Sequence, residues 1–226
     1  MVFWTYSSYA FFVGFGSASG AEQVIKKGQE EGVISKIPGE TTPNPAQQGV
    51  EIVWQKVYNG GGDDGGSGIA VDSSGNVYVT GYSYNGANHD CLTIKYNSSG
   101  NIVWQKAWDG GNDDAGNSIA VDSSGNVYVT GGSYVVGSNN DILTIKYNTS
   151  GNTVWQKVCD AGNYGGAGCG IAVDSSGNVY VTGESNNNND YACLTIKYNG
   201  TNGDTVWQRV YNPGGGVIKA KVLQLI

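Results

Sequence analysis

The chain has 226 residues, of which 37 are glycine and 15 are tyrosine, and only 14% are charged. This composition is typical of short strands and tight turns and excludes a mainly helical protein. The net charge of -7 argues against nucleic acid or anionic lipid as a partner, because both require basic surfaces. We also expect no membrane span, since no stretch approaches the ~18 apolar residues that one needs.

The first 22 residues differ from the rest of the chain. An apolar stretch from Tyr9 to Val13 precedes the small residues Gly16 to Ala21, as in the hydrophobic region and cleavage site of a secretory signal, although the basic start of such a signal is missing. A strand followed by a phosphate-binding loop is an alternative, but the glycine spacing does not fit one. We therefore expect a signal-like segment over residues 1–22, a proline-containing linker over 23–50, and an extracellular, cell-surface or periplasmic protein.

A recurring Val-Trp-Gln motif marks an internal repeat. It begins at Val53, Val103, Val154 and Val206, which gives spacings of 50, 51 and 52 residues. The first unit contains four strand-length runs separated by turn residues: Ile69–Asp72, Val77–Ser83, Leu92–Asn97 and Ile102–Trp108. Units of this length with four antiparallel strands are typical of β-propeller blades.

We therefore expect an all-β fold of three complete blades. Their approximate bounds are residues 59–108, 109–159 and 160–211, within a repeat region over 51–212 and before a tail over 213–226. An orphan outer strand, Ile52 to Tyr58, precedes the first blade. Closed rings need at least four blades, so we expect the chain to be a fragment of a longer one, with self-association that completes a ring, or an open arc, as alternatives.

Two connections in each unit are short and nearly invariant. The sequence VDSSGNVYVTG occurs three times; its aspartate can accept backbone N–H bonds, and its glycine suits the positive-φ position of a type I turn with a G1 bulge. These structural pairs are Asp72 and Gly75, Asp122 and Gly125, and Asp174 and Gly177. The hairpin between the third and fourth strands uses the same device, as in NSSGN at residues 97–101.

The tryptophan of each Val-Trp-Gln motif is interpreted as a wedge between blades rather than as a platform for carbohydrate stacking. Blades pack face to face, so both faces of each sheet need large apolar side chains. These residues are Trp54, Trp104, Trp155 and Trp207.

The other two connections of each unit vary and are rich in Asn, Asp and Gly. Alternate connections of an up-and-down sheet share one end, so we expect these to form a single recognition face. Its candidate residues are Asp63, Asp64, Asp113, Asp114, Asn163, Tyr164 and His89. The pair Asn163 and Tyr164 stands where the other units carry two aspartates.

Carboxylates beside glycines suit a hard cation such as calcium, for which Asp64 and Asp114 would be the ligands. The pattern lacks EF-hand spacing, however, so we favour a solvated Asp-Gly turn over a specific calcium site. His89 is the single histidine and has no catalytic motif around it, so we expect a solvated loop residue.

The four cysteines do not form a metal-binding pattern, because no CxxC or Cys/His cluster is present. Cys91 and Cys193 occupy a position that Ile142 fills in the second unit, which predicts burial. Cys159 and Cys169 flank one connection between blades and could form a disulfide in an oxidising compartment.

VDSSGNVYVTG, followed by LTIKYN, a short turn and VWQK, resembles the SBBP β-propeller repeat of secreted and cell-surface bacterial proteins. The resemblance covers about Ile52 to Asn212 and includes the aspartate ahead of the third strand, Asp90 or Asp141. A looser likeness to NHL-type repeats rests on IAVDSSGNVYV alone. The resemblance implies a propeller and supplies no catalytic residues.

The sequence favours a noncatalytic binding or scaffold module that needs no cofactor apart from a possible calcium ion. Rigid blades that present variable loops are suited to recognition of a protein or a glycan. One alternative is an enzyme, a lyase or hydrolase, that uses Asp64 and Asp114 at the same end. The other is a purely structural element of a surface layer.

Overall fold

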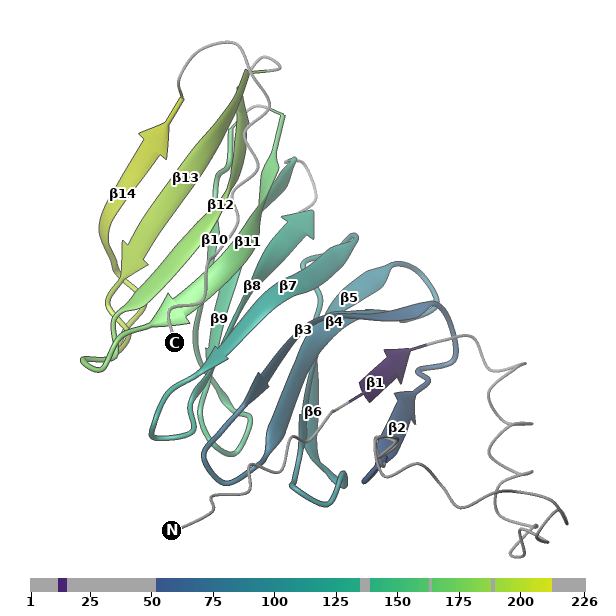
Figure 1. Ribbon diagram of the computed structural model, residues 1–226. Helices are drawn as coiled ribbons and strands as arrows, with labels where there is room; N and C mark the ends of the chain where they lie inside the picture. Colours follow the sequence, from purple (N-terminus) through teal and green to yellow (C-terminus); the bar gives the residue numbers. More distant parts are fainter. Residues whose placement is uncertain (1–11, 16–51, 135–138, 163, 188–189, 213–226) are drawn as a thin grey trace, which may run out of the picture.

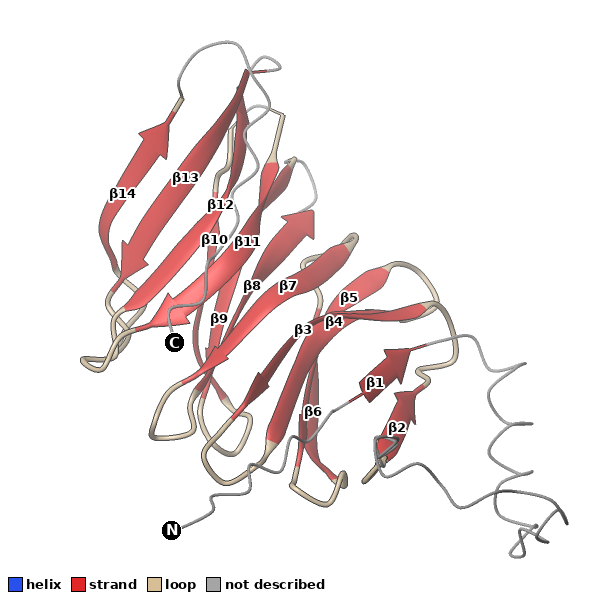
Figure 2. Cartoon of the chain, in the orientation of Figure 1, coloured by secondary structure: helices blue, strands red, loops and turns tan. Residues whose placement is uncertain are grey.

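The computed structural model describes residues 12–15, 52–134, 139–162, 164–187 and 190–212. Twelve strands form three four-stranded antiparallel sheets, in which each strand pairs with the next along the chain, and Figure 2 shows that strands and loops make up the described chain. None of the described segments forms a helix that could cross a membrane.

The three sheets are the predicted blades (Figure 1). Blade 1 consists of β3 (Asp64–Val71), β4 (Val77–Tyr84), β5 (His89–Tyr96) and β6 (Ile102–Trp108). Blade 2 consists of β7 (Asp114–Val121), β8 (Val127–Tyr134), β9 (Asn140–Tyr147) and β10 (Thr153–Cys159). Blade 3 consists of β11 (Gly166–Val173), β12 (Val179–Asn187), β13 (Asp190–Tyr198) and β14 (Thr205–Tyr211).

The blades are stacked side by side like those of a propeller. Their first strands, β3, β7 and β11, contact one another in succession and form the inner side of the array, whereas β6, β10 and β14 are the outer strands. The all-β blade architecture predicted from the repeat is thus confirmed. The described strands form an arc of three blades and do not close a ring.

A separate pair of strands lies ahead of blade 1. β1 (Phe12–Phe15) and β2 (Gln55–Tyr58) pair in parallel, and Trp54 and Tyr58 pack against the buried apolar residues of blade 1. The predicted orphan strand therefore covers blade 1 as the outer strand of a preceding blade would. β1 belongs to the segment predicted to be signal-like, whose other residues lie outside the described part of the chain, as do the linker over 23–50 and the tail over 213–226.

The hairpin between the first and second strands is held by its aspartate. In blade 2 the Asp122 carboxylate accepts hydrogen bonds from the backbone of Ser124 and Asn126, both at 2.9 Å, and from Tyr128 Oη at 2.9 Å. Gly125 has a φ of 80°, which only glycine adopts without strain. Burial alone would raise the pKa of Asp122, but the hydrogen bonds from Asn126, Tyr128 and Ser124 outweigh it and lower the pKa.

Blades 1 and 3 repeat this arrangement, which makes stability sensitive to acid. The pKa values of Asp72 and Asp122 are lowered, and hydrogen bonds led by that from Asn178 lower the pKa of Asp174 to about 2. A carboxylate whose folded pKa is depressed stabilises the fold above its unfolded pKa, and this contribution is lost as the pH falls through the folded pKa. We expect the melting temperature to fall by several degrees as the pH drops from about 4 to about 2.

The measurement is thermal unfolding followed by circular dichroism across this pH range. The triple variant Asp72→Asn, Asp122→Asn and Asp174→Asn should melt lower at neutral pH and lose much of the acid dependence. An unchanged slope in the variant would assign the acid sensitivity to other carboxylates.

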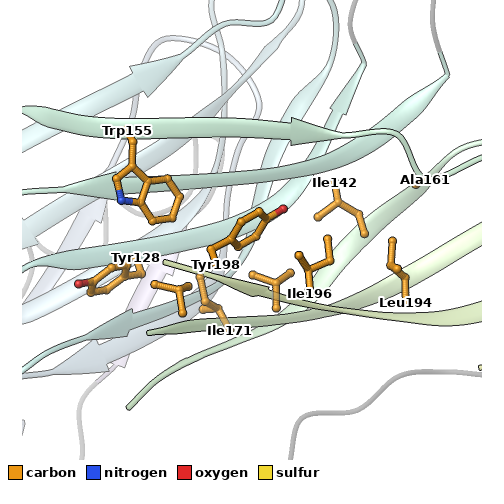
Figure 3. Packing of buried hydrophobic residues seen from close by; sticks show 10 residues of the cluster. Tyr128, Ile142, Trp155, Ala161, Ile171, Leu194, Ile196 and Tyr198 are labelled. Carbon is orange, nitrogen blue, oxygen red and sulfur yellow. The ribbon is translucent and has the colours of Figure 1, made fainter. Parts of the chain in front are cut away.

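Tryptophan side chains join each blade to the next. Trp155 of blade 2 lies against the Tyr198 ring of blade 3, with ring centroids 6.0 Å apart, and its Nε1 donates to the Gly200 carbonyl at 3.1 Å. The indole covers Gly203 so closely that a methyl group there would overlap it. Figure 3 shows Trp155 within the apolar cluster that blades 2 and 3 share.

Trp104 makes the same contacts from blade 1 to blade 2. It lies over Gly151, its ring centroid is 5.9 Å from that of Tyr147, and its Nε1 donates to the Thr149 carbonyl at 3.1 Å. Each interface therefore pairs one indole with a tyrosine ring and a turn glycine of the following blade.

The inner strands are longer than predicted. Strand β3 begins at Asp64, although the glycine-rich residues before Ile69 were assigned to a connection. These glycines allow close packing between blades: a methyl group at Gly116 would overlap Thr80 Oγ1, and one at Gly168 would overlap Thr130 Oγ1. Their composition reflects tight packing near the inner side of the array, not a flexible loop.

The cysteines are all free thiols. Cys91 is fully buried, as predicted, whereas Cys193, for which burial was predicted as well, is partly exposed because no described blade covers that face of blade 3. The suggested disulfide between Cys159 and Cys169 is not formed, because Cys159 ends the outer strand of blade 2 whereas Cys169 lies in the inner strand of blade 3. The connection between them runs from the outer to the inner side of the array.

Candidate functional site

The two ends of the blades differ in structure. At one end the invariant turns meet, and a side chain at Gly75 would touch Ser98. At the other end the variable connections meet: the backbone N–H of Tyr84 donates to the Asp63 carbonyl at 2.9 Å, and that of Tyr134 donates to the Asp113 carbonyl at 3.2 Å. We call the second end, formed by the connections between blades and between second and third strands, the variable end.

Asp64 and Asp114 stabilise the connections between blades. Both are buried, and they accept hydrogen bonds from the backbone of Gly60 at 2.7 Å and of Gly110 at 2.6 Å, respectively. Asp114 also accepts one from the backbone of Tyr134 at 3.2 Å, and burial is the main reason why its pKa is raised. Each carboxylate is thus bonded to the backbone of the connection that precedes its own strand.

These two carboxylates belong to different blades, and the described residues contain no group of three or more acidic, histidine or cysteine side chains that could hold a metal ion. The donor set therefore does not resemble the many-oxygen shell that calcium requires. The calcium site at Asp64 and Asp114 stays a prediction that these contacts do not support.

The third unit differs from the prediction. Asp64 and Asp114 pair with Ser83 and Ser133 across the sheet, and the residue that pairs with Ser185 is Gly166. Gly165 and Gly166 thus replace the aspartate pair, because this connection is one residue longer than the others. The assignment of that place to Asn163 and Tyr164 was wrong; Asn163 lies outside the described residues, and Tyr164 is exposed.

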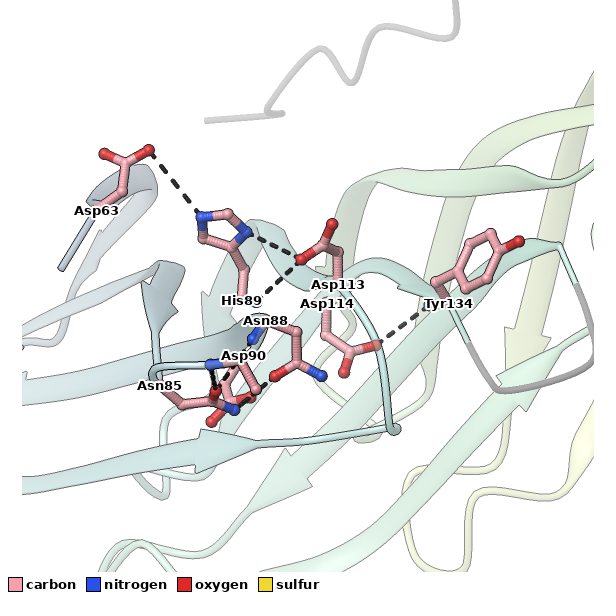
Figure 4. Close-up of polar contacts among 9 residues, drawn as sticks. Asp63, Asn85, Asn88, His89, Asp90, Asp113, Asp114 and Tyr134 are labelled. Carbon is pink, nitrogen blue, oxygen red and sulfur yellow. Dashed lines mark hydrogen bonds and ion pairs between the residues drawn. The ribbon is translucent and has the colours of Figure 1, made fainter.

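His89 joins the connections before and after blade 1 (Figure 4). Its backbone N–H and its ring Nδ1 lie 3.0 and 2.9 Å from Asp113 Oδ1, and its Nε2 lies 4.0 Å from Asp63 Oδ2. The side chain is 31% exposed and makes an edge-to-face contact with Tyr82, with ring centroids 5.2 Å apart. The expectation of a solvated loop residue is therefore wrong.

The hydrogen bonds from the backbone and ring of His89 hold the pKa of Asp113 below its usual value. Asp63 and Asp113 both keep most of their side-chain surface exposed. The variable end thus presents two carboxylates, one from each of two successive connections, on either side of one imidazole ring.

A cavity of about 340 Å³ opens beside these residues. The inner strands contribute Ala115, Asn117 and Ala167 to its lining, and Asn117 Nδ2 also donates to the Gly168 carbonyl of blade 3 at 2.9 Å. The residues that line it come from all three blades and are Asp63, Tyr82, His89, Asp113, Asp114, Ala115, Asn117, Gly132, Asn140 and Ala167. Among these described residues there are three carboxylates and no lysine or arginine.

Sequence analysis missed Tyr82, Asn117 and Asn140 as cavity residues. Tyr82 lies within a strand, Asn117 lies in a glycine-rich run that was assigned to a connection, and Asn140 begins β9. One signal was available: the position of Tyr82 is Gly132 in blade 2 and Glu184 in blade 3, so it varies although the strand around it does not.

The lysines lie toward the other end of the blades. Lys95, Lys146 and Lys197 each stack over a tyrosine ring of their own sheet at 5.1 or 5.2 Å, and Lys146 Nζ also donates to the Gly200 carbonyl in the invariant turn of blade 3 at 2.7 Å. That end also carries the turn aspartates Asp72, Asp122 and Asp174, whereas the cavity of the variable end is lined by carboxylates without a lysine or arginine.

A comparison with known protein families agrees with this architecture. A family model described as a β-propeller repeat, SBBP, matches residues 49–86, 109–140 and 168–191. The chain belongs to the SBBP β-propeller repeat family. The matches fall on the first two strands of each SBBP blade and include the aspartate turn between them. No curated protein matches the chain. A propeller repeat defines a fold and not a ligand.

Proposed function

We propose that this SBBP-repeat chain is a secreted, noncatalytic binding module that recognises a basic side chain, lysine or arginine, of a protein partner at its variable end. Secretion is supported by the signal-like segment in the first 22 residues. The observation that carries the proposal of binding is the convergence of Asp63, Asp113 and Tyr82 around one cavity of about 340 Å³.

The chemistry of the cavity favours a cation. Asp63 and Asp113 are exposed carboxylates without a lysine or arginine partner among the residues that line the cavity. A guanidinium group forms charge-assisted hydrogen bonds with carboxylates, and a tyrosine ring adds attraction for a cation that lies over its face. The amides of Asn117 and Asn140 supply further polar contacts at the edge of the cavity.

The same residues argue against an enzyme. Asp64, which a lyase or hydrolase would use together with Asp114, is buried, bonded to a backbone N–H group and not among the residues that line the cavity, whereas a general acid or base has to reach the substrate. Asp114 lines the cavity, but its carboxylate already accepts hydrogen bonds from the backbone of Gly110 and Tyr134. The arrangement is that of a rigid frame that presents two largely exposed carboxylates, of which Asp113 is held in place by His89.

The test uses two short peptides, Gly-Arg-Gly and Gly-Gln-Gly with blocked ends, titrated into the protein and followed by NMR. The arginine peptide should shift the resonances of Tyr82, Asn117 and Asn140. Asp63→Asn and Asp113→Asn should each weaken binding roughly 5- to 10-fold, because each removes a charge-assisted hydrogen bond.

Asp204→Asn is the matched control, because it removes the same charge from the opposite end of blade 3 and should change affinity less than about twofold. Equal binding of both peptides would contradict the proposal. Shifts caused only by neutral oligosaccharides, added in the same way, would assign the cavity to a glycan.

A further inference from the structure

Each blade has two faces. We call the face toward the next blade along the chain its trailing face, and the opposite one its leading face. We propose that the trailing face of blade 3 is a docking surface for the leading face of blade 1 in a second copy of this chain. The five residues that form this trailing face are Ala172, Tyr180, Cys193, Trp207 and Tyr211.

Blades 1 and 2 show what this face does when a blade follows it. Tyr78 and Tyr128 are buried there, and both belong to apolar clusters shared with the next blade. Tyr180 holds the same position in blade 3 but is only partly buried. In the same way Cys193 is partly exposed, whereas Ile142, its counterpart in blade 2, is fully buried.

Trp207 is the wedge of this face. It makes a tilted ring contact with Tyr180 of its own blade, with ring centroids 6.4 Å apart, as Trp104 does with Tyr78 at the same distance. Trp104 also inserts over the turn glycine of the next blade, but no further turn follows Trp207 in the described part of the chain. Tyr211, beyond it on the same strand, is 65% exposed.

The leading face of blade 1 is incompletely covered at the other end of the array (Figure 1). Ile69 is 51% exposed, whereas the residues at the same position in blades 2 and 3, Ile119 and Ile171, are 8% and 6% exposed. Val71 is exposed as well. A complete preceding blade therefore covers this isoleucine in blades 2 and 3, whereas strand β2 leaves Ile69 of blade 1 exposed.

The acceptor site on blade 1 has the residues that the internal interfaces use. Gly100 and Tyr96 correspond to Gly151 and Tyr147 of blade 2, and at present they hold the indole of Trp54. The internal interfaces are formed by the same repeat, so the trailing face of blade 3 is complementary to this site. Trp54 is a competitor for Trp207 within the same chain.

This competition predicts weak association. A segment tethered to its own site has an effective concentration in the millimolar range, so Trp54 outcompetes a second copy until the protein is concentrated. The contact joins two different faces, and copies would therefore assemble head to tail. The exposed Ile69 and Val71 supply apolar area that only the second copy buries.

The experiment measures the mass of the full chain by light scattering between about 5 and about 500 μM. Trp54→Ala vacates the site over Gly100 and should lower the concentration for association at least tenfold relative to the wild type. Adding Trp207→Ala to Trp54→Ala should restore the monomer. Tyr164→Ser, which removes an exposed aromatic ring at the variable end, should leave association unchanged.

Circular dichroism establishes that each variant is folded. If Trp54→Ala does not fold, Trp54→Phe keeps a ring in the site and should show an intermediate increase in association. If the Trp54→Ala variant is folded but stays monomeric at every concentration, the proposal is overturned. This holds whether the trailing face of blade 3 is then bare or covered by residues 213–226. Association that persists after Trp207→Ala would overturn it as well.

Discussion

Trp155→Ala is expected to lower the free energy of unfolding by about 3–5 kcal/mol, as large aromatic truncations in cores do. Trp155 is buried between blades 2 and 3, and the substitution removes its contacts with Tyr198 and Gly203. It also leaves the Gly200 carbonyl without the indole donor. The space left by the missing indole lies at the interface between blades 2 and 3, so the lost stability should appear as weaker docking of blade 3 on blade 2.

Chemical denaturation of the dilute protein measures this effect, and Trp207→Ala is the matched control. Trp207 has the same sequence neighbours and the same position on the outer strand, but it lacks a following blade in the described chain and is only partly buried. We expect it to cost about 1 kcal/mol or less. Equal losses for the two variants would mean that the indole stabilises its own sheet and not the interface.

Gly168→Ala is expected to destabilise the protein by about 2–3 kcal/mol, although alanine is a small residue. The added methyl group would overlap Thr130 Oγ1 of the preceding blade. That hydroxyl is buried and donates to the Leu143 carbonyl at 2.8 Å, so it cannot move aside without losing a hydrogen bond. The inner strands of blades 2 and 3 would be forced apart next to Ala167, which lines the cavity.

Gly66→Ala makes the same substitution at the equivalent position of blade 1, where no preceding blade places a threonine against the glycine. Gly66 pairs with Gly81 as Gly168 pairs with Gly183, but it is exposed, and the substitution should change stability by less than about 1 kcal/mol. Thr130→Ala combined with Gly168→Ala should recover part of the loss. If Gly168→Ala were as stable as the wild type, the close approach of the blades would not depend on glycine.

The exposed carboxylates of the variable end and the exposed faces of blades 1 and 3 can both be recognised by comparing the repeats. Each blade presents the same scaffold, so a difference between blades shows where a local role departs from the shared one. Ile69 differs from Ile119 and Ile171 in exposure alone, which indicates a missing neighbour. Tyr82 and Gly132 occupy the same position in blades 1 and 2 and both line the cavity, and their difference in residue type is consistent with a binding site there.

The sequence by itself determined the blades and their invariant turns. An aspartate and a glycine three residues apart, such as Asp122 and Gly125, define a hairpin through bonds to nearby backbone N–H groups and through one positive φ. These interactions span a few residues, so they can be predicted from residue type and spacing. The period of the Val-Trp-Gln motif then gives the number of units.

Only the tertiary structure decided what surrounds the cavity. His89 bonds to Asp113, 24 residues away and in the connection to the next blade, and no local pattern indicates that pairing. The same holds for the buried role of Asp64 and Asp114 and for the glycines of the inner strands, which were interpreted as loop residues. Their environment is set by how closely neighbouring blades approach, and that distance depends on side chains that lie some fifty residues apart in the sequence.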